Sequence, residues 1–230
     1  MDHAEGQGRE RATRGNRRSR PNQTLAPVQR LRQMIQCMRL PAEQSQPASR
    51  FAAYLKAEAD TGIKHEYRDG HIVAMAGGSP AHSAVAATIL GELHAQLKSS
   101  PCQPHGSDFR VRYGERTFYP DVLVVSPPPQ LDPELPHTLL NPRVIVEVLS
   151  PGTETHDRGY KWFHYQQIPE LTDFLLVSLE QQTVEHYLRQ SDSSWLYQRL
   201  ELADTVKLTS IGCELPVAAC FARMDMWRDS

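Results

Sequence analysis

Two nearly continuous apolar segments constrain the fold of this chain more than any other feature. They read Asp-Val-Leu-Val-Val at 121–125 and Val-Ile-Val-Glu-Val-Leu at 144–149. Strands on a surface alternate polar and apolar residues, whereas continuous apolar runs are typical of strands covered on both faces. Residues 174–177, Phe-Leu-Leu-Val, repeat this pattern. We therefore predict a buried central sheet with helices on both faces.

Helix and turn signals surround these strands. A long helix is predicted over 80–98, with Ser79 as its N-cap. Further helices are predicted after a capping Ser49 and over 155–168. The dipeptide Asp69-Gly70 between two strand-like runs predicts a hairpin, because both turn positions need a positive φ. This order of elements indicates an α+β or mixed α/β fold, with a central mixed sheet flanked by helices.

Charge is divided unevenly along the chain, although the formal net charge is only −2. Residues 1–40 contain nine arginines and three acids, while residues 41–230 contain 16 basic and 24 acidic residues. A protein that binds nucleic acid over a broad surface normally has a basic body. The acidic body therefore limits any nucleic-acid contact to a local site, helped by a metal ion or by the N-terminal segment.

The domain boundaries follow from the same contrast. Residues 1–47 are predicted to be a disordered basic tail, because they are rich in charge and poor in apolar residues. Such a tail suits a nucleic-acid arm, but a solvated leader or a start codon assigned too early explains it more simply. The folded domain is predicted to span 48–224, followed by a C-terminal tail at 225–230.

Cysteine content and hydropathy indicate the compartment. The four cysteines, Cys37, Cys102, Cys213 and Cys220, form no Cys-x-x-Cys pair, so neither a zinc knuckle nor a redox motif is predicted. No apolar run approaches the roughly 18 residues of a membrane span. With no signal peptide recognised, the expected location is the reducing cytoplasm.

Two acids interrupt the apolar strands. Asp121 opens the first segment directly after Pro120, and Glu147 lies inside the second. A carboxylate in a buried strand is costly unless it is paired or binds a metal. Two such acids on neighbouring strands would make a hard-oxygen site that suits Mg²⁺ or Mn²⁺. Lys161, on the helix that follows, would stabilise negative charge on a phosphate and orient the attacking water.

Each of these residues has a simpler structural explanation when it is taken alone. An Asp after proline is more often a turn residue, a lone strand glutamate is more often a salt-bridge partner, and a helix lysine is nearly always solvated. The combination, in this order along the chain, is much more specific than its parts.

The residues around these positions resemble a known family. The matching segments are 119–125, 144–151 and 157–161, with Tyr165, and upstream Glu66–Gly70, 75–77, His82 and 212–216. They resemble the Uma-two family of proposed endonucleases, in the restriction-endonuclease-like (PD-D/E-x-K) superfamily. The resemblance covers about residues 50–221. It implies a restriction-endonuclease-like core.

The resemblance also implies a role for each matched residue. Asp121 and Glu147 would be metal ligands on the two core strands, and Glu66 would complete the metal site from the N-terminal hairpin. The superfamily often has a lysine two positions after the strand acid, but Leu149 stands there. Lys161 on the next helix would take over that role.

Four further residues are implied to lie near the site. His82 would contact phosphate or support the metal ligands, and Tyr165 would pack or hydrogen-bond beside the lysine. Asp157 and Arg158 would hold the loop over the site. Gly152 departs from the family, because a serine or similar small polar residue is expected there, but this removes no proposed ligand.

Three histidines are given ordinary structural roles. His156 and His164 are expected to be satisfied surface histidines, and His186 is expected to be exposed on an alternating strand.

The leading hypothesis is a metal-dependent endonuclease that hydrolyses phosphodiester bonds in DNA, with Mg²⁺ or Mn²⁺ as cofactor. One alternative is a non-catalytic nucleic-acid-binding or regulatory module that retains the nuclease fold. Another is a structural core in which the acids and the lysine form a buried ion cluster. The expected partner is nucleic acid, most simply DNA, without membrane association. A homodimer would suit the cutting of two strands.

Overall fold

The apolar segments of the sequence lie at the centre of a six-stranded sheet. The computed structural model describes residues 47–75 and 77–227, all within the unit Ser45–Ser230. In this part of the chain the strands are ordered β11-β10-β9-β8-β6-β3. Three are buried along almost their whole length: β6 (Val122–Val125), β8 (Pro142–Leu149) and β9 (Asp173–Ser178). The others are β3 (Gln103–Gly106), β10 (Thr183–Arg189) and β11 (Trp195–Leu200).

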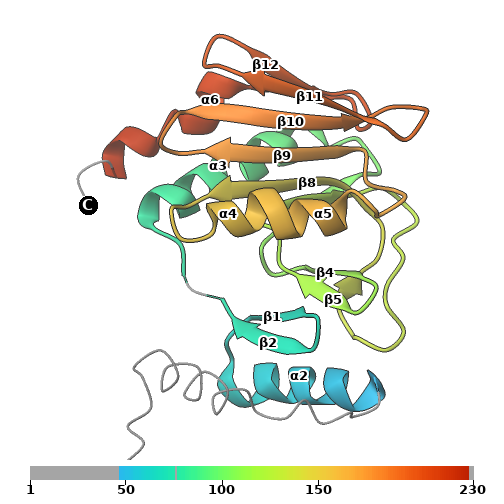
Figure 1. Cartoon of the computed structure of the whole chain (residues 1–230). Helices are drawn as coiled ribbons and strands as arrows, with labels where there is room; N and C mark the ends of the chain where they lie inside the picture. The colour runs from blue at the N-terminus through green and yellow to red at the C-terminus, as the bar shows by residue number, and fades with distance from the viewer. Residues whose placement is uncertain (1–46, 76, 228–230) are drawn as a thin grey trace, which may run out of the picture. The chain divides into compact units, whose positions relative to one another are not determined.

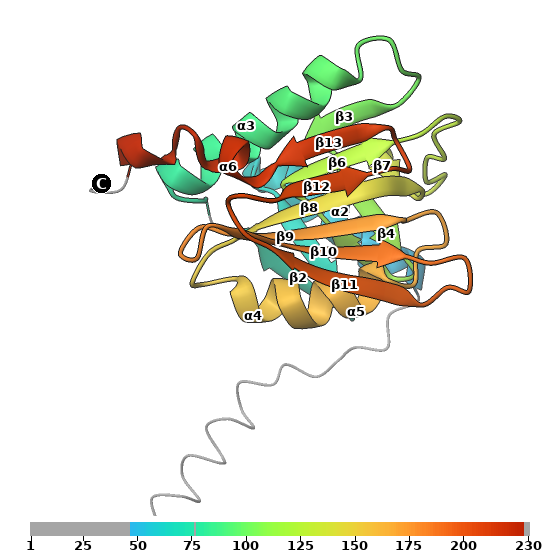
Figure 2. The same cartoon turned by 90° about the horizontal axis from the view of Figure 1, so that it is seen from above.

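Helices and a hairpin cover the two faces of this sheet (Figures 1 and 2). Even-numbered residues of β6 and β8 form one core with α3 (Pro80–Gln96) and with the hairpin of β12 (Thr205–Leu208) and β13 (Cys213–Pro216). Odd-numbered residues of the same strands form a second core around Tyr165 and Ile168. Because β8 runs parallel to β9 but antiparallel to β6, the sheet is mixed. The predicted mixed sheet flanked by helices is confirmed.

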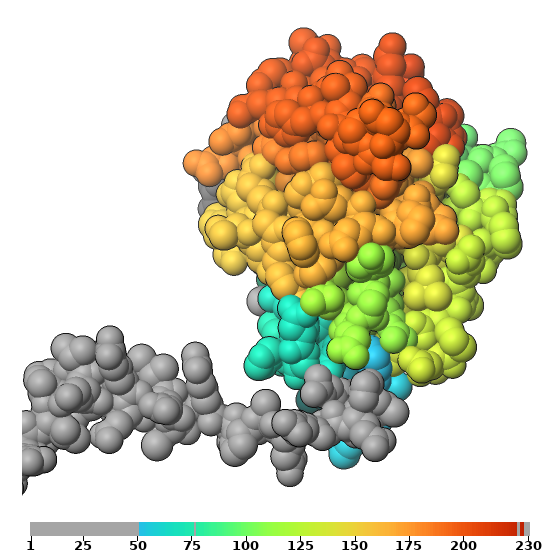
Figure 3. Space-filling model, turned by 45° about the vertical axis from the view of Figure 1, so that its right-hand side comes forward, coloured from blue at the N-terminus to red at the C-terminus, as the bar shows by residue number. Residues whose placement is uncertain are grey.

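A smaller five-stranded sheet carries the N-terminal part of the described chain. Its order is β2-β1-β5-β4-β7. The strands are β1 (His65–Arg68), β2 (His71–Ala74), β4 (Arg110–Tyr113), β5 (Arg116–Phe118) and β7 (Thr138–Leu139). Helix α2 (Pro47–Thr61) packs on it through Phe51 and Tyr54, which contact the ring of Tyr67. In the space-filling view (Figure 3), the upper part of the visible face is orange, the colour of β10 to β12 and the turns between them in Figure 1.

The β1–β2 hairpin turns at the predicted dipeptide. Asp69 has a φ of 49° and Gly70 a φ of 91°, so both turn positions have the positive φ that was expected. Ser79 is also confirmed as the N-cap of α3, since its hydroxyl accepts a hydrogen bond from the backbone N–H of His82 at 3.2 Å. The predicted cap at Ser49 is wrong, because α2 begins at Pro47 and Ser49 lies inside it.

The predicted helix over 155–168 is built from three short pieces. They are α4 (Glu154–His156), the π-helical turn η1 (Asp157–Lys161) and α5 (Trp162–Tyr165). At the C-terminal end, α6 (Val217–Phe221) is followed by the 3-10 helix η2 (Met224–Trp227). Regular structure therefore extends to Trp227, into the segment 225–230 that was predicted to be a tail.

The ends of the chain lie outside the described residues. This applies to the tail predicted at 1–47, apart from Pro47, and to residues 228–230. Within the described ranges, no helix combines the length and apolar character needed to cross a membrane.

A buried polar network joins β9, β10 and the turn between β12 and β13. His186 Nε2 lies 2.8 Å from Asp173 Oδ1, and the hydroxyls of Thr172 and Ser210 donate to Asp173 Oδ2 at 2.8 and 2.6 Å. Asp173 and His186 are both buried. The expectation that His186 is exposed was therefore wrong.

Replacing Asp173 with alanine should lower the free energy of unfolding by about 3 kcal/mol, because three hydrogen-bonding groups would lose a buried acceptor. Urea unfolding followed by circular dichroism measures this change. Glu115→Ala, at an exposed position between β4 and β5, is the control and should leave the unfolding curve almost unchanged. A loss below about 1 kcal/mol for Asp173→Ala would contradict the network's role in stability.

Candidate active site

The pairing of β6 with β8 places the two strand acids opposite each other. Val122, the first residue of β6, pairs with Val146, so continuing this register by one position places Asp121 next to Glu147. Directly opposed residues of an antiparallel pair project to the same face of the sheet. The Asp121 side chain is held there by the backbone N–H of Val148, which donates to Asp121 Oδ2 at 2.8 Å.

The π-helical turn η1 brings a third acid and a lysine to the same place. Asp157 and Lys161 are its first and last residues, and both are buried. Single π-helical turns are rare and are frequently found at functional sites. Lys161 Nζ lies 3.0 Å from Asp157 Oδ1 and 3.0 Å from Glu147 Oε2.

Lys161 also joins the two sheets. Its Nζ lies 3.4 Å from Glu66 Oε1 on β1, in addition to its contacts with Asp157 and with Glu147 on β8. The other Glu66 oxygen is bonded to Arg68 and lies 3.4 Å from His156 Nε2. Three carboxylates from three different elements therefore surround one ammonium group.

Burial and charge shift the pKa values of this cluster in different directions. Burial raises the pKa of Glu147 well above its ordinary value, and the neighbouring carboxylates add to the rise, while Lys161 opposes it. Burial would also raise the pKa of Glu66, but hydrogen bonding with His156 and the charges of Lys161 and Arg68 lower it to about 2. The surrounding carboxylates raise the pKa of Lys161 against the effect of burial. Of Glu66 and Glu147, Glu147 is therefore the residue whose ionised form is disfavoured.

Tyr165, at the end of α5, is hydrogen-bonded to Glu147. Its hydroxyl donates to Glu147 Oε1 at 3.0 Å, and the side chain is fully buried. Burial raises the pKa of Tyr165 well above its ordinary value, and the charge of Glu147 raises it further. Both oxygens of Glu147 are thus engaged, one by Lys161 and one by Tyr165.

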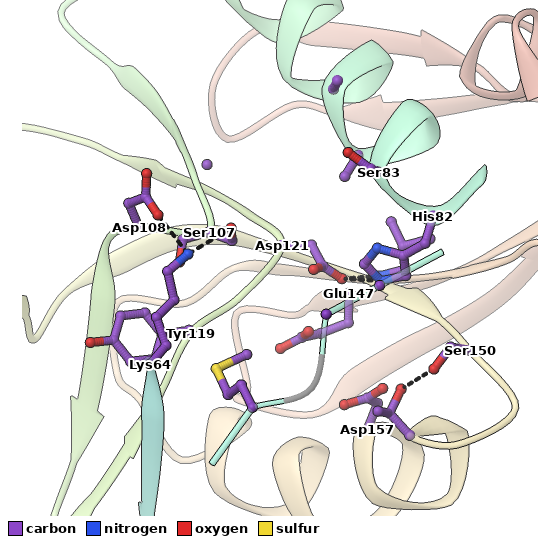
Figure 4. A pocket seen from close by; sticks show the side chains of 18 of the residues that line it. Lys64, His82, Ser83, Ser107, Asp108, Tyr119, Asp121, Glu147, Ser150 and Asp157 are labelled. Atoms are coloured by element: carbon purple, nitrogen blue, oxygen red, sulfur yellow. Dashed lines mark hydrogen bonds and ion pairs between the residues drawn. The ribbon is translucent and has the colours of Figure 1, made fainter. Parts of the chain in front are cut away.

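A cavity of about 850 Å³ opens beside these acids (Figure 4). Asp121, Glu147, Asp157 and Lys161 line one part of it, whereas Glu66 does not line it. Other parts of its wall come from the start of α3, from the turn after β3, and from the residues before β1 and β6: His82, Ser83, Ser107, Asp108, Lys64 and Tyr119.

His82 lies where α3 begins and points at Asp121 (Figure 4). Its Nε2 lies 3.2 Å from Asp121 Oδ2, and hydrogen bonding to this carboxylate raises the pKa of His82. The ring passes close to the backbone of Gly78, where an added Cβ would lie 2.7 Å from His82 Nδ1. The glycine directly before the helix cap therefore leaves the space in which the His82 ring lies.

Most of the residues singled out in the sequence lie together. The structure brings together Glu66, His82, Asp121, Glu147, Asp157, Lys161 and Tyr165. It does not bring Arg158 to the cavity. The Arg158 guanidinium instead binds Glu154 and, through Nη1, both oxygens of Glu185 at 2.6 Å.

The two histidines of this helix differ from expectation. His156 contacts the Glu66 carboxylate and stacks on Tyr160, with ring centroids 5.1 Å apart. His164 is buried beside Phe118. Neither is therefore a simple surface residue, and His156 is a residue of the site that the sequence analysis missed. Its spacing of four residues from Tyr160 was the available signal, because such pairs share one helix face.

The comparison with known proteins adds the family. The family model Uma2, described as "Putative restriction endonuclease", matches residues 51–218. This chain belongs to the Uma2 family. Two uncharacterized proteins of Synechocystis sp., slr1290 and sll1609, are 36% identical over 166 residues and 31% identical over 151 residues. These alignments cover 71% and 65% of this chain, and 86% and 85% of the relatives.

A solved structure has the same fold. It is a crystal structure from Anabaena variabilis, described as a "putative nuclease belonging to DUF820", and matches with a TM-score of 0.60 and 20% identity. The match covers 71% of this chain and 93% of the other. The resemblance drawn from residues and motifs is thus confirmed, and at the level of the family the Uma2 assignment supports a nuclease.

The cluster of this Uma2 protein suits a hard divalent cation by its chemistry. Within the described residues, no three His, Cys, Asp or Glu side chains are arranged as a complete metal site. Mg²⁺, however, is usually bound by one or two carboxylates together with water and substrate phosphate. Glu66 Oε1 and Asp157 Oδ1 are buried, and their contacts are ion pairs with the one ammonium of Lys161. Buried carboxylate oxygens that share a single ammonium fit the binding of an additional cation.

Glu147→Gln should gain thermal stability relative to the wild type as the pH rises. The pKa of Glu147 is higher in the folded protein than in the unfolded chain. Protonated Glu147 therefore contributes to the free energy of unfolding below about pH 4.5, and this contribution is lost as the pH rises through the folded-state pKa. Glutamine keeps the shape but cannot ionise. Differential scanning fluorimetry in EDTA, from about pH 5 to about pH 9, measures the Tm difference.

The expected size of the Tm difference follows from the same link between ionisation and folding. Each unit of pKa shift corresponds to about 1.4 kcal/mol, and about 1 kcal/mol moves Tm by roughly 2–4 °C in a domain of this size. Glu201→Gln, at an exposed position, should show a flat Tm difference over the same range. A flat difference for Glu147→Gln as well would contradict the raised pKa.

Proposed function

We propose that this Uma2 protein is a metal-dependent endonuclease that hydrolyses phosphodiester bonds in DNA. One observation carries the proposal: Asp121, Glu147 and Asp157 line one part of a cavity, and the ammonium of Lys161 in the same wall is shared by the carboxylates of Glu66, Glu147 and Asp157. The family supports the nuclease activity. The metal ion and the DNA substrate are supported by the chemistry of the side chains.

Asp121 and Glu147 are the residues proposed to hold Mg²⁺ or Mn²⁺. When bound, such an ion would polarise the phosphodiester and lower the pKa of an attacking water. Glu66 was expected to be a third ligand. In the structure it is bonded to Arg68 and lies beside Lys161, which favours a role in holding Lys161.

Lys161 supplies fixed positive charge at the cavity wall. Its ammonium is surrounded by acids, and they keep it protonated by raising its pKa. A preorganised cation of this kind stabilises the negative charge that develops on a phosphate during hydrolysis. His82 holds Asp121 and adds positive charge when protonated, a state that its raised pKa favours.

A second candidate is a non-catalytic module in which the cluster is structural. The observation that favours it is the burial of Lys161, whose Nζ already faces three carboxylates. A buried ion cluster of this kind can fix the relative position of elements without chemistry. Metal binding and cleavage distinguish the two candidates.

Purified protein should cut plasmid or single-stranded DNA with Mg²⁺ or Mn²⁺ and should be inactive in EDTA. Asp121→Asn and Glu147→Gln should each lower the rate at least about a hundredfold, because each removes a charge on which the reaction depends. Asp192→Asn makes the same change as Asp121→Asn at an exposed position and should retain wild-type activity. Gel-based cleavage kinetics measure the rates.

Calorimetric titration with Mn²⁺ completes this test. Metal binding that is lost in Glu147→Gln, together with metal-dependent cutting, is the expected result. Folded wild-type protein that neither cuts nor binds Mn²⁺ would favour the structural cluster. If the protein binds Mn²⁺ but cuts neither plasmid nor single-stranded DNA, the metal site is supported and DNA is rejected as the substrate.

A homodimer is the assembly we propose for cutting both strands of a duplex. The strand β11 supports it, because it is the edge of the six-stranded sheet and exposes Leu196 and Tyr197. An exposed edge strand can pair with the same strand of a second chain. Sedimentation equilibrium should give a dimer, and Tyr197→Lys should shift it toward the monomer. A monomeric wild type at micromolar concentration would exclude this assembly.

The cytoplasm is the proposed location. The thiols of Cys102, Cys213 and Cys220 are free, and this suits a reducing compartment.

A further inference from the structure

A lysine lines the cavity away from the acids. Lys64 lies directly before β1, and its Nζ donates to the backbone oxygen of Ser107 at 3.0 Å and to the Ser107 hydroxyl oxygen at 3.2 Å. It also forms an ion pair with Asp108 Oδ1 at 2.5 Å. The ring of Tyr119 lies beneath it, with Nζ 5.8 Å from the centroid. Figure 4 shows this group apart from His82, Asp121 and Glu147.

Of the two lysines that line the cavity, only Lys64 is accessible to a ligand. The Lys161 side chain is 6% exposed and its ammonium faces three carboxylates. The Lys64 side chain is 37% exposed. A polyanion entering the cavity would therefore meet Lys64 as its lysine contact, while Lys161 acts from within the wall.

The partner of Lys64 is easily exchanged. The Asp108 side chain is 95% exposed, and an ion pair between groups so open to water contributes little to stability. The two Ser107 contacts, by contrast, fix Lys64 from the protein side. Because the Ser107 hydroxyl oxygen accepts from Lys64, its own proton is available to donate to an incoming oxygen.

We propose that Lys64 and the Ser107 hydroxyl form a subsite for a backbone phosphate of the nucleic acid, and that Asp108 occupies this subsite in the free protein. The inference rests on the proposed nuclease function and specifies how the substrate is held. On binding, a phosphate oxygen takes the position of the Asp108 carboxylate, while the contacts of Lys64 to Ser107 remain.

The acidic character of the domain explains why a phosphate would need Lys64. The part of the chain that contains the cavity carries more acids than bases, and the catalytic end of the cavity is itself acidic. A phosphodiester therefore needs a local cation to approach those acids. An exposed aspartate that must be displaced also weakens the binding of anions less highly charged than a nucleic-acid chain.

Binding of a fluorescein-labelled single-stranded oligodeoxynucleotide tests the subsite. Fluorescence anisotropy is recorded with full-length protein in EDTA over a range of salt concentrations. Lys64→Ala should reduce the slope of log K against log salt by about 0.7, which corresponds to roughly fourfold weaker binding near 0.15 M salt. Lys64→Arg should keep the wild-type slope, because it keeps the charge.

Asp108→Asn should have the opposite effect, at least about a twofold gain in affinity, because the competing carboxylate is removed. In a Lys64→Ala background the same change should give no such gain. Lys207→Ala and Asp192→Asn make the same charge changes at exposed positions and serve as controls. The arginine-rich segment 1–40 is present in every variant, so its contribution cancels.

The proposal requires both effects. It is overturned if Lys64→Ala binds like Lys207→Ala, if Asp108→Asn gains no more than Asp192→Asn, or if the wild type does not bind the oligonucleotide. Lys64-dependent binding without cleavage would leave the subsite standing and reject the nuclease function. Normal cleavage by Lys64→Ala would retain the nuclease and reject the subsite.

Discussion

The ion cluster around Lys161 is the interaction on which the rest of this structure depends. One buried ammonium faces Glu66 from the five-stranded sheet, Glu147 from the six-stranded sheet and Asp157 from the π-helical turn. Without the ammonium, three like charges would be buried close together, a state that a protein interior does not tolerate. The lysine therefore both assembles the acids and ties the two sheets to one helix.

The same cluster explains how an acidic domain can suit a polyanionic substrate. Three carboxylates share the ammonium of Lys161, and burial together with neighbouring acids raises the pKa of Glu147. An added divalent cation would favour the ionised form of these acids, so metal binding and substrate approach become linked. Lys64 lies at another part of the same cavity. The site is thus divided between an acidic end for metal and chemistry and a basic contact for the chain that is cut.

Secondary structure and the chemical nature of the site could be predicted because they depend on local pattern. Continuous apolar runs marked β6 and β8, and the two acids within or beside those runs are unusual enough to indicate a site. The failures concern side-chain direction. Asp157 and Arg158 are adjacent, yet consecutive residues of a helical turn point in different directions, and here only Asp157 faces the cavity. The π-helical turn selects Asp157 and turns Arg158 toward Glu185.

The sequence by itself determined the apolar strands, the Asp69-Gly70 turn, the cap of α3 and the residue types of the site, because each depends on neighbours along the chain. Only the tertiary structure decided which charges converge. The contact of His156 with Glu66, the burial of His186 against Asp173 and the place of Lys64 in the cavity all join residues from separate elements. Such contacts follow from how sheets and helices pack, and packing distances between distant segments leave no local pattern in the sequence.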